Sequence, residues 1–314
     1  METKSLISRL KGKYNCDIID KAVIINADCF EVLNSFNDNS IHAIVTDPPY
    51  GVKEYEFDEI NKKDNGNGGV WRIPPSFDGN VRSPLPRFTA LTKNEKDKLF
   101  EFFREFGKSI VRVLKPGGHA IIASNSYLSL SVFSAIVNDE LEFRGNIVRL
   151  VRTLRGGDRP KNAETEFSDM STMPRGCFEP WGLFRKNLLP KMKVSECLKE
   201  FQTGALRRQT DGRPFEDVIK SERTTQRERK ISNHPSLKPQ SFMRKVVYSA
   251  LPLGEGVILD PFMGAGTTLA AANFFNYNSI GIERHFEYYE SAKASIKELS
   301  LIATDEIQLD FNYA

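Results

Sequence analysis

The sequence has few of the residues that would indicate a metal centre, a disulfide framework or a membrane anchor. Its 314 residues include only four cysteines, which lie far apart and form no Cys-x-x-Cys pair. Zinc binding and redox chemistry therefore have little support, and no metal site is predicted. No stretch approaches the roughly 18 apolar residues of a membrane span, and the N-terminus lacks the apolar core of a secretory signal. We expect a cytoplasmic protein with no membrane partner, whose core is large enough to fold without metals or disulfides.

The net charge of +3 is small, but it is unevenly distributed. Residues 152–230 contain 18 lysines and arginines against 12 aspartates and glutamates, so the rest of the chain is net negative. A basic segment can bind the phosphate backbone of a nucleic acid, or it can be a solvated insertion laced with salt bridges. The charge alone leaves both interpretations open.

Segments whose apolar residues are typical of strands alternate along the chain with segments whose apolar residues recur at helical spacing. Short β-branched runs at residues 21–27 and 41–46 predict buried parallel strands. Apolar residues at helical spacing predict a helix over residues 94–114, which a Lys-Pro-Gly-Gly turn ends. Further strands are predicted at residues 119–124, 145–151, 177–184, 256–259 and 279–282, and further helices at residues 128–138, 240–251, 267–275 and from 286 on. This alternation predicts an α/β fold with a doubly wound, mostly parallel, Rossmann-like sheet.

A glycine turn follows the predicted strand that ends at Asp260. It reads Pro-Phe-Met-Gly264-Ala-Gly266-Thr-Thr, and glycine allows a ligand to approach the backbone closely. The turn lacks the third glycine of the dinucleotide fingerprint and the Lys-Ser/Thr of a phosphate loop, which favours a cofactor without phosphate. The next strand ends at Glu283, about 20 residues further on, where a carboxylate can accept hydrogen bonds from ribose hydroxyls. A surface glutamate is the alternative for that residue taken alone.

The tetrad Asp47-Pro48-Pro49-Tyr50 directly follows the predicted strand at residues 41–46. The exocyclic amine of adenine or cytosine is a poor nucleophile, because its lone pair is delocalised into the ring. Asp47 and the carbonyl of Pro48 can accept the two N–H bonds of such an amine and direct its lone pair at a methyl donor. Tyr50 can stack on a base that has left the duplex. The structural alternative is a proline turn that only ends the strand.

Both motifs, and their order, resemble the amino-group DNA methyltransferases of restriction–modification type in their circularly permuted beta arrangement. In that arrangement Asp-Pro-Pro-Tyr precedes the recognition region and Phe-x-Gly-x-Gly follows it. The resemblance spans most of the chain and includes Asn-Ala-Asp-Cys at residues 26–29 and His-Pro-Ser-Leu-Lys-Pro at residues 234–239. It implies S-adenosyl-L-methionine as the cofactor, duplex DNA as the substrate, a cognate restriction endonuclease as a partner, and a monomer or homodimer.

The resemblance also assigns roles to individual residues. It implies that Asp28 meets the adenine of the cofactor, that Phe262 packs on the cofactor, and that Lys238 lies near its carboxylate. The catalytic candidates are Asp47, Pro48, Pro49 and Tyr50. The candidate cofactor-binding residues are Asp28, Cys29, Lys238, Asp260, Phe262, Gly264, Gly266, Thr267, Thr268 and Glu283. The candidate DNA-binding residues are Arg155, Arg159, Arg207 and Arg208, for each of which a solvated surface position is an equal alternative.

On this basis we predict three parts. Residues 1–155 form the catalytic half of the methyltransferase domain, residues 156–233 a target-recognition region with a core strand near 177–185, and residues 234–314 the cofactor-binding half. Residues 54–92, rich in glycine and proline, are predicted to form a long loop.

The predicted reaction is methylation of adenine N6, because the family leans to adenine with Asp in the tetrad and to cytosine with Ser. Three alternatives stay open: cytosine-N4 methylation, methylation of RNA or a protein amide, and a DNA-binding protein without catalysis.

Overall fold

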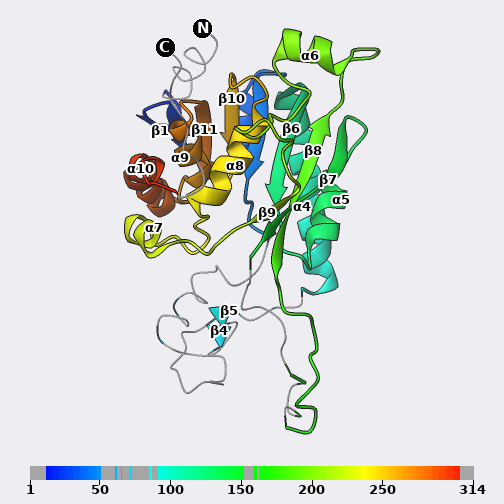
Figure 1. The fold of residues 1–314 in the computed structure, drawn as a ribbon, viewed down its shortest axis with the longest axis vertical. Helices are drawn as coiled ribbons and strands as arrows, with labels where there is room; N and C mark the ends of the chain where they lie inside the picture. The colour runs from blue at the N-terminus through cyan, green and yellow to red at the C-terminus, as the bar shows by residue number, and fades with distance from the viewer. Residues whose placement is uncertain are drawn as a thin grey trace.

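A computed structural model of the chain describes residues 12–50, 91–151 and 165–304, together with residues 61, 65, 71–72, 85–86, 159–160 and 163. Most of the predicted loop at residues 54–92, and Arg155, lie outside the described residues. The described chain is built on a nine-stranded sheet with helices on both faces (Figure 1).

The sheet is mostly parallel. Its strands follow one another in the order β1 (Asn15–Ile19), β2 (Ala22–Asn26), β11 (Asn278–Glu283), β10 (Val257–Asp260), β3 (Ile41–Thr46), β6 (Leu114–Ala123), β8 (Phe178–Lys186), β7 (Leu141–Leu150) and β9 (Val218–Lys220). The five strands from β2 to β6 pair in parallel, whereas β1 and β8 run antiparallel to their neighbours. This confirms the predicted Rossmann-like fold. Three features were not predicted from the sequence: β1, β9 and the separate two-stranded pair of β4 (Trp71–Arg72) and β5 (Leu85–Pro86).

The permuted order of the chain is visible at the centre of the sheet. β10, from the C-terminal part, pairs in parallel with β3, from the N-terminal part, and Ile258 lies opposite Ala43. Parallel neighbours end at the same edge of a sheet. Asp47 after β3 and the glycine turn after β10 therefore open side by side, although more than 200 residues separate them in the sequence.

Two groups of helices cover the sheet. One face carries α2 (Cys29–Ser35), α4 (Lys93–Val113) and α5 (Ser129–Ile136), and the other carries α8 (Gln240–Ala250), α9 (Thr267–Phe274) and α10 (Phe286–Ser300). Side chains of β3 alternate between the two cores: Ile44 packs under α4, and Ala43 and Val45 pack under α8. A capping box between Thr92 and Glu95 sets the start of α4.

The prediction of a Lys-Pro-Gly-Gly turn after α4 is wrong in detail, because residues 115–118 form the irregular start of β6. Gly117 adopts a φ of +73°, and a Cβ there would come within 2.8 Å of the Gly204 Cα. Glycine at position 117 therefore permits the start of β6 to pack closely against the backbone at Gly204.

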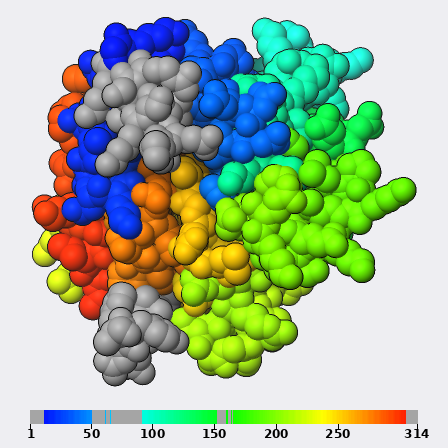
Figure 2. Space-filling model, turned by 90° about the horizontal axis from the view of Figure 1, so that it is seen from above, coloured from blue at the N-terminus to red at the C-terminus, as the bar shows by residue number. Residues whose placement is uncertain are grey.

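Residues 187–213 lie at the end of the sheet where the central strands begin. Their helix, α6 (Val194–Phe201), is followed by Gly204, whose N–H donates to the Gly117 carbonyl (3.0 Å), and Arg207, whose N–H donates to the Ser249 carbonyl (2.9 Å). Figure 2, which views the molecule from this end, shows the yellow-green atoms of this segment beside the yellow atoms that follow α8. By contrast, the described residues 165–177 project beyond the other end of the sheet (Figure 1).

Candidate active site

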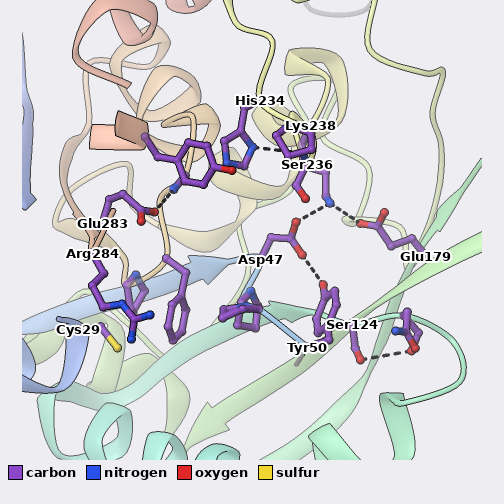
Figure 3. A pocket seen from close by; sticks show the side chains of 18 of the residues that line it. Cys29, Asp47, Tyr50, Ser124, Glu179, His234, Ser236, Lys238, Glu283 and Arg284 are labelled. Atoms are coloured by element: carbon purple, nitrogen blue, oxygen red, sulfur yellow. Dashed lines mark hydrogen bonds and ion pairs between the residues drawn. The ribbon is translucent and has the colours of Figure 1, made fainter. Parts of the chain in front are cut away.

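A cavity of about 980 Å³ opens at the carboxyl ends of the central strands. This volume is at the upper end of small-molecule sites and suits a cofactor together with a base. The candidate residues that line it are Asp28, Cys29, Asp47, Pro48, Pro49, Tyr50, Lys238, Phe262, Gly264 and Glu283. Figure 3 shows Glu283, Arg284 and Cys29 at one end of the cavity and Tyr50 and Ser124 at the other, with Asp47 between them.

Glu283 is fixed at its end of the cavity by two backbone amides. Its Oε2 accepts from the Gly264 N–H (3.1 Å) and its Oε1 accepts from the His285 N–H (2.8 Å). Burial raises the pKa of the Glu283 carboxyl, and these bonds oppose the rise. Each oxygen keeps a further lone pair, so the carboxylate can still accept hydroxyl donors from a ligand.

Phe262 forms an apolar wall of the same part of the cavity. Its ring lies 5.2 Å from that of Phe106 and 6.1 Å from that of Phe102, both on α4. A flat, rigid apolar surface of this kind suits an aromatic ring system.

Asp28 and Cys29 lie where β2 gives way to α2. Asp28 caps this helix, because its Oδ1 accepts from the Phe30 N–H at 2.9 Å. Burial raises the pKa of the Cys29 thiol to about 12. The thiol therefore stays protonated near neutral pH and is a poor nucleophile.

Asp260, Thr267 and Thr268 lie beneath this cavity, around a small space of about 30 Å³. The Asp260 carboxylate accepts from Thr46 Oγ1 (2.6 Å) and from the Phe262 N–H (3.2 Å), and it also bonds to Thr268. Burial raises the pKa of Asp260 to about 6. The contact with Thr46 ties the end of β10 to the end of β3, so Asp260 aligns the two motifs.

Gly266 lines neither cavity but packs against α10. Its φ is +74°, and a Cβ there would lie 2.5 Å from Cγ1 of the fully buried Ile296. Gly266→Ala is therefore expected to lower the free energy of unfolding by about 3 kcal/mol, from backbone strain and overpacking together. Urea unfolding measures this loss. The matched control is Gly212→Ala, where φ is +82° but nothing lies within 4 Å, and the expected loss is about 1 kcal/mol. Equal losses in the two variants would contradict the packing argument.

Both oxygens of Asp47 accept hydrogen bonds. Oδ1 accepts from the Tyr50 hydroxyl, and Oδ2 accepts from Nζ of Lys238 at 2.5 Å. Burial alone lowers the pKa of the Lys238 ammonium, but Asp47 and Glu179 outweigh that effect and raise it. Lys238 is therefore charged, and its ammonium contacts the catalytic candidate itself.

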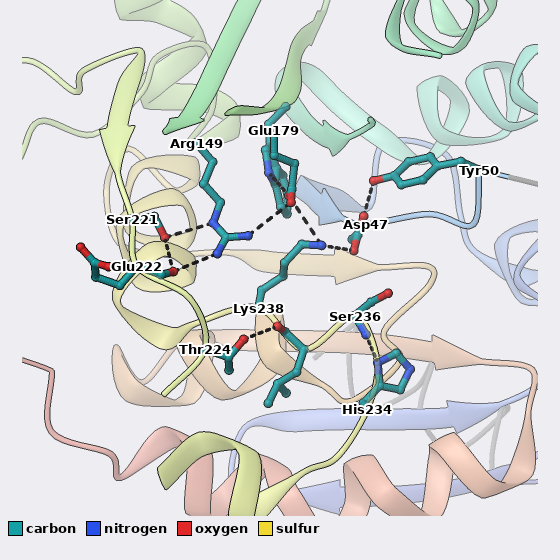
Figure 4. Close-up of polar contacts among 12 residues, drawn as sticks. Asp47, Tyr50, Arg149, Glu179, Ser221, Glu222, Thr224, His234, Ser236 and Lys238 are labelled. Carbon is teal, nitrogen blue, oxygen red and sulfur yellow. Dashed lines mark hydrogen bonds and ion pairs between the residues drawn. The ribbon is translucent and has the colours of Figure 1, made fainter. Parts of the chain in front are cut away.

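Glu179 was not predicted from the sequence, and it lies 3.6 Å from the Lys238 ammonium. Glu179 Oε1 accepts from Trp181 Nε1 (2.8 Å), and its Oε2 accepts from the Arg149 guanidinium (3.3 Å; Figure 4). The sequence Phe-Glu-Pro-Trp places the Glu179 carboxylate at the start of an apolar strand, and this could have indicated a functional residue. Arg149 and Lys238, which contact Glu179, are distant in the sequence, so the local pattern does not reveal these contacts. Residues 124–127, which follow β6 and line the cavity, were not predicted from the sequence either.

The three candidate arginines that the structure describes, Arg159, Arg207 and Arg208, do not all belong to the cavity. Arg207 and Arg208 are at the end of the sheet opposite the cavity. The Arg207 guanidinium stacks 4.4 Å from the Tyr248 ring and donates to the Tyr277 hydroxyl (2.7 Å). Arg208 donates to the Gly212 carbonyl (3.0 Å), and Arg159 is exposed.

In the part of the chain that the structure describes, no group of three or more His, Cys, Asp or Glu side chains could hold a metal ion. Among the described helices, none combines the length and the apolar character that a membrane span requires.

Known proteins resemble this chain over most of its length. A family model described as DNA methylase, for N6 and N4 methyltransferases, matches residues 41–294. The Type II methyltransferase M2.DpnII of Streptococcus pneumoniae is 24% identical over 285 residues, which cover 88% of this chain and 90% of that protein.

Two solved structures share the fold. A putative DNA modification methylase of Thermus thermophilus, in complex with S-adenosyl-L-methionine, has a TM-score of 0.55 at 17% identity, covering 90% of this chain and 95% of that one. The PvuII DNA methyltransferase, which is cytosine-N4-specific, has a TM-score of 0.55 at 14% identity, covering 91% and 88%.

Proposed function

The chain belongs to the DNA methylase family of N6 and N4 amino-methyltransferases of restriction–modification type, and we propose that it methylates adenine N6 in duplex DNA. The observation that carries this proposal is the position of Asp47. Its carboxylate stands between the Glu283 end of the cavity and the end at Tyr50, so a base and a methyl donor can meet beside it.

The methyl donor is S-adenosyl-L-methionine, whose sulfonium supplies an electrophilic methyl group. The residues at the Glu283 end of the cavity suit such a molecule. Glu283 is held by backbone amides with acceptor capacity left for ribose hydroxyls, and the ring of Phe262 offers an apolar wall. The solved methylase of Thermus thermophilus, which shares this fold, is a complex with the same compound.

The target base occupies the end at Tyr50. Asp47 accepts one N–H of the amine and the Pro48 carbonyl accepts the other, which favours a pyramidal nitrogen whose lone pair points at the methyl group. Tyr50 offers its ring for stacking, an interaction worth about 1–3 kcal/mol per base. The proton that the methylated nitrogen releases passes to Asp47 or to water.

The choice of adenine rests on the aspartate at position 47, because the family leans to adenine with Asp and to cytosine with Ser. Cytosine-N4 methylation is the second candidate, since the cytosine-N4-specific PvuII enzyme shares the fold. Asp47 and the Pro48 carbonyl can accept the two N–H bonds of the exocyclic amine in adenine and in cytosine alike.

The test is to methylate unmodified duplex DNA with the purified protein, digest it to nucleosides and identify the product by mass. We expect N6-methyldeoxyadenosine. N4-methyldeoxycytidine would contradict the adenine assignment while leaving the mechanism intact. Labelled methyl transfer confined to RNA or protein would reject the DNA substrate.

The proposal extends to how DNA is held. Residues 165–177 project from the cavity side of the sheet and include exposed Arg175 and Met173, so this segment can lie along a bound duplex (Figure 1). Arg159 and Arg155 belong to the same proposed contact. A cognate restriction endonuclease and a monomeric or homodimeric state are also proposed.

A further inference from the structure

The ammonium of Lys238 lies between two carboxylates of the cavity. Its Nζ is 2.5 Å from Asp47 Oδ2 and 3.6 Å from Glu179 Oε1 (Figure 4). The side chains of all three residues are at least about four-fifths buried. The three groups therefore interact with little screening by water.

This arrangement opposes the role of Asp47 in methyl transfer. As the new N–C bond forms, the amine nitrogen becomes positive, and Asp47 must attract its N–H more strongly. An ammonium bonded to the same carboxylate weakens that attraction and places a second positive charge beside the nitrogen. The reaction would therefore proceed faster with the ammonium held elsewhere.

We propose that Glu179 is a positioning residue that takes the Lys238 ammonium from Asp47 when the target base enters. The inference rests on the proposed role of Asp47 as the acceptor of the amine. A movement of about 1 Å brings Nζ to hydrogen-bonding distance from Glu179. The flexible lysine side chain allows this movement.

The surroundings of Glu179 suit a fixed receiving group. Arg149 holds one of its oxygens and is itself held by Ser221 Oγ (3.0 Å) and the Glu222 carbonyl (3.1 Å). The indole N–H of the fully buried Trp181 donates to the other oxygen of Glu179. The positive charges of Arg149 and Lys238 balance the negative charges of Asp47 and Glu179. The lysine can therefore exchange one carboxylate partner for the other without changing the net charge of the buried cluster.

The first test is Glu179→Gln, which keeps the size of the side chain and an oxygen for Trp181 but removes the charge. The single-turnover rate of methyl transfer to duplex DNA is expected to fall about 10- to 100-fold, with the Kd of S-adenosyl-L-methionine within about twofold of wild type. A merely structural role would instead raise that Kd. Glu142→Gln is the matched control, since Glu142 pairs with Arg185 (2.6 Å) on the neighbouring strands, outside the cavity, and should keep the wild-type rate.

A double-mutant cycle with Lys238→Gln decides whether Glu179 acts through the lysine. In the Lys238→Gln background, Glu179→Gln should cost little or nothing further. The same loss in both backgrounds, or a wild-type rate for Glu179→Gln, would overturn the inference.

Glu179→Asp keeps the charge and should retain more of the rate than Glu179→Gln, and equal rates would likewise overturn the inference. Asp47→Ala separates this inference from the proposed function. Turnover retained in Asp47→Ala rejects the mechanism as a whole. If Asp47→Ala loses turnover but the effects of Glu179→Gln and Lys238→Gln on the rate are additive, only the role of Glu179 is rejected.

Discussion

Asp47→Ala is expected to lower the single-turnover rate of methyl transfer by about 100- to 1,000-fold or more, because the amine loses its charged acceptor in the transition state. The dissociation constant of S-adenosyl-L-methionine should stay within about threefold of wild type, since Glu283 and Phe262 at the cofactor end are unchanged. Rapid-quench assays with labelled cofactor and duplex DNA give the rate, and calorimetry gives the affinity.

The matched control for this variant is Asp139→Ala. Asp139 is exposed between α5 and β7, away from the cavity, and its removal should leave the rate unchanged. Unchanged turnover in Asp47→Ala would show that the carboxylate is not the acceptor. A lost rate accompanied by lost cofactor binding would point instead to a general collapse of the site.

Glu283→Ala should raise the dissociation constant of S-adenosyl-L-methionine about 10- to 100-fold. The variant removes a charged acceptor that is proposed to bind ribose hydroxyls, and hydrogen bonds to charged groups contribute about 1.5–3 kcal/mol. It also frees the amides of Gly264 and His285, which loosens the glycine turn. Calorimetric titration of the purified protein with the cofactor measures the effect.

Two further variants make this result specific. Glu290→Ala removes an exposed carboxylate from α10, the helix that follows β11 and Glu283. Glu290 does not line the cavity, so this variant should bind the cofactor normally. Glu283→Gln keeps an acceptor oxygen and should bind more tightly than Glu283→Ala. Wild-type affinity in Glu283→Ala would exclude Glu283 from the cofactor site.

The sequence predicted the strands of the sheet well, because β-branched runs such as residues 41–46 are buried on both faces and carry a strong local signal. It also predicted that Asp47 and the glycine turn each directly follow a strand. It did not predict β1 or β9. The three residues of β9 form a strand only because β7 offers them a free edge to pair with.

The site shows where local patterns stop being informative. Gly264 and Gly266 look alike in the sequence, but Gly264 faces the cavity and Gly266 faces Ile296. The contact between Lys238 and Glu179 depends on three-dimensional packing that a motif does not describe. Arg207 was a candidate by charge, yet its guanidinium is taken up by Tyr248 and Tyr277 at the far end of the sheet.

The most direct test of the central claim is to map methylated bases in DNA from cells that express the protein and from cells that express Asp47→Ala. The mechanism predicts N6-methyladenine at one recurring sequence in the first DNA and none at those positions in the second. Methylation on cytosine N4, or the same adenine methylation in both, would contradict it.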